Sequence, residues 1–134
     1  MNKFIKKLSN YLIFCYLSIP IIGFAEGKLS SKFTRCMEKV TSTADSINCM
    51  DTENKAQDKR LNVAYQKLIR LESTNRQKEL QSAQKLWLKY QKANCDYYYN
   101  SDDGTIMQQM SASCWLESTK DRANELEFLI SLKK

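Results

Sequence analysis

The sequence predicts an all-α fold, a small antiparallel bundle of three main helices or four. Two disulfides are expected to cross-link the helices. The chain contains no proline after Pro20, and its only glycines after residue 25 are Gly27 and Gly104. Apolar residues recur at helical spacing over long stretches. Four cysteines, an even number, follow residue 25. A chain so poor in helix breakers favours helices over strands.

The first 25 residues have the pattern of an export signal. Three lysines lie within the first seven residues, and an apolar run of about fifteen residues follows. Gly23 and Ala25 form the small-x-small pattern that precedes cleavage, so we expect a cut before Glu26 and a single domain over residues 26–134. An uncleaved membrane anchor is the alternative, but a span needs about 20 apolar residues. Phe14 before Cys15 argues against lipidation, because a lipid attachment site requires a small residue there.

These features predict a periplasmic or secreted protein with no membrane contact after signal cleavage. The net charge is +6, but the predicted signal contains three of the excess positive charges. The other basic residues are interspersed with acids, which is typical of solvated helix faces rather than nucleic-acid binding. We therefore expect no nucleic-acid partner.

The composition also excludes most catalytic chemistry. No histidine occurs, which removes Ser–His and Cys–His pairs and histidine metal ligands. No glycine-rich phosphate loop is present. An EF-hand loop with Gly104 at its sixth position would place Tyr99 first and Met110 twelfth, where oxygen ligands are required. We expect no enzyme, no catalytic residue, no cofactor and no metal.

The first predicted elements lie between residues 31 and 71. Residues 31–41 show no clean period and are expected to form an irregular lead-in or a short helix. Ser42 and Asp45 form a capping box at the start of a helix over about residues 42–71, which is continuous or breaks near residues 49–52. Its expected apolar face consists of Ile47, Met50, Leu61, Ala64, Tyr65, Leu68 and Leu71.

Two further helices complete the predicted bundle. One runs from about residue 75 to residue 98, and its expected buried face consists of Leu80, Ala83, Trp87, Tyr90 and Ala93. After a polar break, Thr105 is expected to cap the last helix. The apolar stripe of that helix consists of Ile106, Met110, Leu116, Ala123, Leu126 and Leu129 or Ile130.

The four cysteines Cys36, Cys49, Cys95 and Cys114 are expected to form two disulfides, because an exported chain meets an oxidising compartment. They lack the C-x-x-C spacing of zinc sites. Cys49 and Cys95 are equidistant from the predicted turn near residue 72, so we favour Cys49–Cys95 with Cys36–Cys114. Cys95–Cys114 is the rival pairing, since it is centred on the next turn, and Cys36 then folds back onto Cys49.

Three motifs occur in order with these cysteines, within residues 58–65, 83–95 and 119–126. The residues that carry them are Asp58, Leu61, Asn62, Tyr65, Ala83, Gln84, Trp87, Tyr90, Thr119, Arg122, Glu125 and Leu126. In this set the chain resembles the LprI-type lysozyme-inhibitor domain, a small exported helical bacterial domain, over about residues 36–129. It departs from the family at Gln91 and Lys92, where Arg-Asp is common, and at residues 103–105, where Gly-Gly-Ser is usual.

The motif residues are expected to be structural. Tyr65, Trp87 and Tyr90 lie on apolar faces, where aromatic rings pack into cores with their polar atoms at the edge. Asn62 and Arg122 are expected to close hydrogen-bond networks, for example with Asp58 or Glu125.

The resemblance implies an inhibitor that blocks the cleft of a lysozyme, a protein partner. The stretch CDYYYNSDDGT suits such a contact, because tyrosines give large contact area at low entropic cost and acids meet basic groups around the cleft of a cationic enzyme. The candidate partner-binding residues are Asp96, Tyr97, Tyr98, Tyr99, Asp102 and Asp103. A plain helix–helix turn is the structural alternative. The functional alternative is another envelope binding module, such as an immunity protein against a cell-wall hydrolase.

Overall fold

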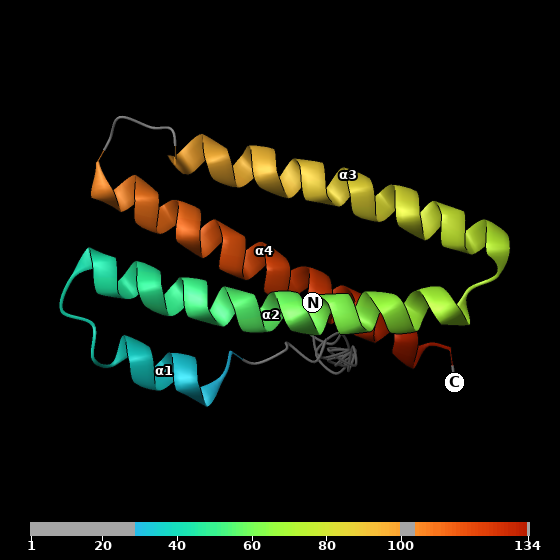
Figure 1. Ribbon diagram of the computed structural model, residues 1–134, viewed down its shortest axis with the longest axis horizontal. Helices are drawn as coiled ribbons and strands as arrows, with labels where there is room; N and C mark the ends of the chain where they lie inside the picture. The colour runs from blue at the N-terminus through green and yellow to red at the C-terminus, as the bar shows by residue number, and fades with distance from the viewer. Residues whose placement is uncertain (1–28, 100–103, 134) are drawn as a thin grey trace, which may run out of the picture.

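The computed structural model describes residues 29–99 and 104–133, and this part of the chain is all-helical, as predicted. Figure 1 shows its four helices, α1 (Ser31–Met37), α2 (Thr43–Leu71), α3 (Thr74–Tyr99) and α4 (Thr105–Ser131). The predicted signal over residues 1–25 lies outside the described residues. Among the helices that are described, none is both long enough and apolar enough to cross a membrane.

The three long helices do not form a compact triangle. In Figure 1, α4 runs between α2 and α3 over much of its length, and the short α1 lies against the far side of α2. The main packing is between α2 and α4, α3 packs chiefly on α4, and α2 and α3 hardly touch. Consecutive helices α2 and α3 are therefore joined by a turn without being paired neighbours.

Two apolar clusters stabilise this arrangement. The larger joins α2 to α4, and its buried members are Leu61, Ala64, Leu68, Ala123 and Leu126. The smaller, at the α1 end, consists of Met50, Ala112 and Leu116, with Leu29, Phe33 and Ile47 packed against it. Several residues expected in the core are instead exposed, namely Leu71, Ala83, Tyr90, Ala93, Ile106 and Met110. Three of these residues, Ala83, Tyr90 and Ala93, lie on α3, which packs chiefly on one neighbour, α4.

The predicted helix start at residue 42 is confirmed. The Ser42 hydroxyl accepts a hydrogen bond from the Asp45 amide at 3.1 Å, and Asp45 in turn accepts from the amide and hydroxyl of Thr41. The α2 helix is continuous through residues 49–52. Thr105 does not cap α4. It is the first helical residue, and Gly104, with φ of 80°, occupies the capping position without a side-chain hydrogen bond.

The favoured disulfide pairing is wrong. The disulfides are Cys36–Cys49, which ties α1 to α2, and Cys95–Cys114, which ties α3 to α4, with Cα–Cα distances of 5.8 and 5.5 Å. The Cys49–Cys95 prediction assumed that α2 and α3 pair along their lengths. Because α4 lies between α2 and α3, Cys95 of α3 faces α4 and bonds to Cys114. Cys49 of α2 faces α1 and bonds to Cys36.

Peptide mapping of the unreduced chain by mass spectrometry should recover Cys36 linked to Cys49 and Cys95 linked to Cys114. The C95A/C114A variant should lose about 3 kcal/mol of unfolding free energy in urea, because the bridge closes a loop of 19 residues. Peptides that link Cys49 to Cys95 would contradict the observed helix arrangement.

A buried carboxylate anchors the N-terminal segment to α2. Glu53 accepts hydrogen bonds from the amide of Ser30 at 2.9 Å, from its hydroxyl at 2.5 Å and from the Gln57 amide group at 2.8 Å. Burial alone would raise the Glu53 pKa, but the hydrogen bonds from Ser30 and Gln57 together outweigh it and lower the pKa below its ordinary value of 4.5.

The sign of this shift predicts acid lability. Because the folded-state pKa is lowered, the Glu53 carboxylate stabilises the fold fully above pH 4.5, and the contribution is lost as the pH falls through the lower folded-state pKa. We expect E53Q to be less stable than the parent at pH 7, with the difference shrinking towards pH 3 in urea titrations. The exposed Glu38, changed to Gln, is the control, and an equal effect at both positions would contradict this role.

Candidate functional site

Arg122 organises the contact between α3 and α4. Its side chain is largely buried, and its Nε donates to the Oε1 atom of Gln84 at 3.0 Å. Its Nη1 pairs with Glu125 at 2.7 Å, and its guanidinium lies 5.9 Å from the Trp87 ring centroid. The expected partnership of Arg122 with Glu125 is confirmed, and Gln84 extends the network to α3.

A second polar contact lies about two turns along the same seam. The Gln91 side chain donates to the hydroxyls of Ser118 at 3.0 Å and Thr119 at 2.9 Å. The buried residues of α3 are Gln84, Gln91 and Cys95, so the side that faces α4 is largely polar. The buried face expected from the apolar residues of this helix did not include this side. The signal that would have revealed it is the seven-residue spacing of Gln77, Gln84 and Gln91.

The remaining motif residues divide between core and surface. Leu61, Thr119 and Leu126 are buried, while Tyr65 and Trp87 are half-buried against the larger apolar cluster. This burial fits the structural role expected for these residues. Asn62 donates to the side chain of Asp58 at 3.1 Å, but this exposed pair lies within α2 and joins no other helix. Tyr90, expected in the core, is 65% exposed.

The candidate partner-binding tyrosines lie at the C-terminal end of α3. Tyr97 and Tyr99 are 74% and 62% exposed, whereas Tyr98 is half-buried. The rings of Tyr97 and Tyr98 meet edge to face with centroids 5.7 Å apart. Asp96 forms an ion pair with Lys92 on the same helix, which offsets its charge. Asp102 and Asp103 lie outside the described residues.

A groove between α3 and α4 adjoins one of these tyrosines, Tyr98. Its volume is about 400 Å³, and it is lined by Tyr90, Asn94, Tyr98, Met110, Ser113, Cys114, Glu117, Ser118 and Asp121. Lys120 pairs with Glu117 and lies 3.7 Å from Asp121, so one unit of negative charge remains for the three groups. Aromatic walls with polar and acidic groups fit a protruding polar or basic segment of a protein.

One comparison with known proteins, the comparison with family models, gave a match. Residues 36–126 match the family described as Lysozyme inhibitor LprI. The chain belongs to this family. The matched region contains all four cysteines and all three motifs. No curated protein and no solved structure gave a match.

The groove of this LprI domain has a rigid floor. The Cys95–Cys114 disulfide joins its two walls, and the Ser111 hydroxyl donates to the Cys95 carbonyl at 3.0 Å. The Asn94 amide group lies 3.4 Å from the sulfur of Cys114. The tyrosines therefore project from a helix end whose position is fixed covalently before any partner binds.

A larger groove of about 610 Å³ lies between α2 and α4. It is lined by Ala56, Lys59, Arg60, Val63, Ala64, Lys67, Glu127, Ile130 and Ser131. Arg60 is already paired with Glu127 there at 2.6 Å. This groove contains no aromatic side chain, and aromatic residues are the usual anchors of protein interfaces. The α3–α4 groove is therefore the better candidate despite its smaller volume.

The α4 wall of the site was not found in the sequence. Met110, Ser113, Glu117 and Asp121 follow one another at spacings of three and four residues, so they lie on one side of a helix. That regular spacing was available, but only the packing of α4 against α3 places these residues beside Tyr98. Within the described residues, no group of three His, Cys, Asp or Glu side chains is placed to bind a metal.

Arg122 offers a test of the polar seam. R122M should lower the unfolding free energy in urea by about 2 kcal/mol, because it leaves the buried Gln84 oxygen without its donor and removes the contact with Trp87. R70M, at an exposed position of α2, is the matched control and should change stability by under about 0.5 kcal/mol. Equal effects would contradict the role assigned to Arg122.

Proposed function

We propose that this LprI domain inhibits a lysozyme by placing the end of α3 in the enzyme's sugar-binding cleft. The family match supports an inhibitor rather than an enzyme. The observation that carries the proposed contact is the exposure of Tyr97 and Tyr99 on a helix end fixed by the Cys95–Cys114 disulfide.

The physical argument is one of preorganisation. A segment that is ordered before binding loses little conformational entropy on association, and the disulfide orders the base of this one. Each tyrosine supplies a large apolar surface with a hydroxyl at its edge, at the cost of two side-chain torsions. Tyr97 and Tyr99 point to different sides of the helix end because they are two residues apart. Together they present a surface wider than a single ring.

The charge of this end complements a basic partner. Glu117 and Asp121 lie along the groove, and Lys120 offsets only one of them. By sequence, Asp102 and Asp103 add two acids to the connection between α3 and α4. Local acids of this kind guide a cationic enzyme towards the site even though the chain as a whole is basic.

We also propose export to the periplasm or the cell exterior, with removal of residues 1–25. Lysozyme acts on the cell envelope, so an inhibitor must reach that compartment. Two disulfides fit an oxidising environment, since they are rare in the cytosol.

Binding and inhibition assays test this proposal directly. The oxidised chain over residues 26–134 should inhibit at least one of the animal-type, goose-type and invertebrate-type lysozymes at physiological salt. Y97A and Y99A should each weaken inhibition by at least about 10-fold, because buried interface tyrosines are typical hot spots. Their circular dichroism should be unchanged, since both side chains are exposed and alanine favours helices.

V63A is the matched control, because Val63 is an equally exposed apolar residue on α2. Unchanged inhibition by the tyrosine variants would contradict the site. Failure of the parent chain to bind any lysozyme would contradict the function. Binding to a bacterial cell-wall hydrolase instead would assign the chain to immunity against that enzyme.

A further inference from the structure

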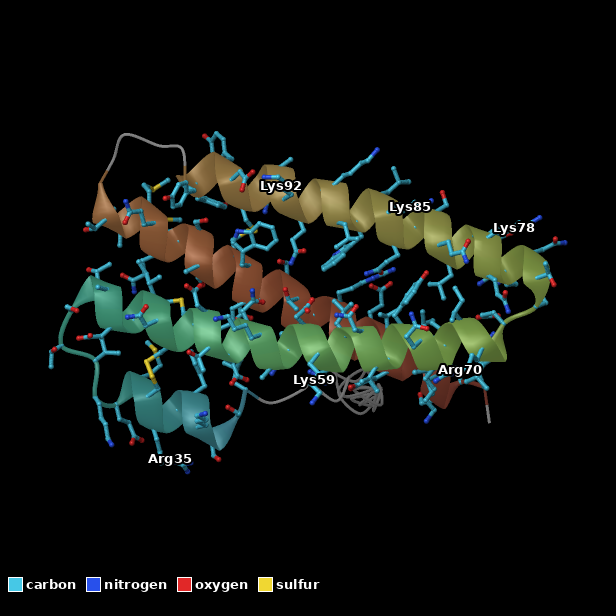
Figure 2. All side chains as sticks on the ribbon, in the orientation of Figure 1. Arg35, Lys59, Arg70, Lys78, Lys85 and Lys92 are labelled. Carbon is cyan, nitrogen blue, oxygen red and sulfur yellow. A yellow bond between two sulfur atoms is a disulfide. The ribbon has the colours of Figure 1, made fainter. Side chains whose placement is uncertain are left out.

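A row of lysines follows the outer side of α3. Lys78, Lys85 and Lys92 are seven residues apart, about two helical turns, and Lys89 lies between the last two. We call these four residues the lysine row. All four are exposed, and Figure 2 labels three of them along α3. Within the described residues α3 packs chiefly on α4, and the exposed row lies away from the buried residues of α3, Gln84, Gln91 and Cys95.

The positive charge of this row is largely uncompensated. Lys92 pairs with Asp96, but within the described residues Lys78, Lys85 and Lys89 form no ion pair. The one other acid of α3, Glu79, pairs with Arg76. Three free positive charges in one line favour an anionic partner and oppose pairing of this face with a second copy of itself.

Exposed leucines flank the row. Leu86 and Leu88 are 64% and 51% exposed and lie between Lys85 and Lys89 in the sequence. On a helix they fall on opposite sides of the lysines, because they are two residues apart. Long lysine side chains extend their charged ends to lipid headgroups, and leucines on either side of them can contact the headgroup boundary. Such a basic and apolar helix face is typical of contact with a membrane surface.

We propose that the lysine row docks this protein on an anionic phospholipid surface, with Leu86 and Leu88 at the headgroup boundary. This peripheral contact revises the expectation of no membrane contact after signal cleavage, and it needs no span or lipid anchor. A membrane is favoured over an acidic protein because none of the grooves described above is lined by these lysines. The row is a line of exposed point charges along one helix, which suits a flat and fluid anionic surface.

Vesicle sedimentation of the oxidised chain over residues 26–134 tests the proposal. The chain should bind vesicles containing phosphatidylglycerol, should not bind pure phosphatidylcholine, and should bind more weakly in 500 mM salt. K78Q/K85Q/K89Q should weaken binding by about 100-fold. The single variant L86Q should bind the phosphatidylglycerol vesicles more weakly than the parent chain. Its loss should be largest in high salt, where the apolar contact contributes most of the remaining binding.

K55Q/K59Q/K67Q is the matched control, because it removes the same charge from exposed positions of α2. Equal loss in both triple variants would show that net charge alone matters and would overturn the assignment to α3. No binding by the parent chain would also overturn it. Equally tight binding to polyglutamate, with no effect of L86Q on the vesicles, would replace the membrane with an acidic chain.

The outcome is independent of the proposed inhibition. Without vesicles, K78Q/K85Q/K89Q should inhibit lysozyme as the parent does, because the tyrosine end of α3 is unchanged. Circular dichroism should confirm that each variant folds, which is expected because glutamine and lysine have similar helix propensities.

Discussion

The attachment of α3 to α4 is the constraint on which the rest of the molecule depends. Helix α3 is held chiefly from one side, through the contacts of Gln84 and Gln91 and through the Cys95–Cys114 disulfide. A polar seam of this kind buries less apolar surface than the α2–α4 contact and therefore stabilises the fold less. The disulfide adds stabilising free energy at this contact. Because only one side is used, the opposite side of a long helix remains available for partners.

This one-sided packing explains which predictions from sequence succeeded. The helix positions followed from local signals, namely the Ser42 cap and the lack of proline, and these act within a few residues. The disulfide pairing did not follow, because it depends on α4 lying between α2 and α3. The buried side of α3 was misassigned for the same reason. Tyr90 fits an apolar stripe on its own helix, but the neighbouring helix meets the glutamine side instead.

The candidate site shows the same division. The tyrosines at the end of α3 were recognisable as a cluster, since they are adjacent in the sequence. The α4 wall, with Glu117 and Asp121, comes from a segment about twenty residues away and becomes part of the site only through helix packing. The family motifs contributed differently. Most of their residues build the core and the α3–α4 seam, so they specify the fold on which the site is built.

Hydrogen–deuterium exchange with a bound lysozyme tests the central claim, that the α3–α4 end is the partner surface, most directly. The amides of the oxidised chain would be compared with and without a saturating amount of the enzyme that it inhibits. We expect slower exchange in peptides covering residues 96–117 and no change along the outer side of α2. Protection confined to peptides of the α2–α4 groove, around Val63 and Ile130, would contradict the site that we assign.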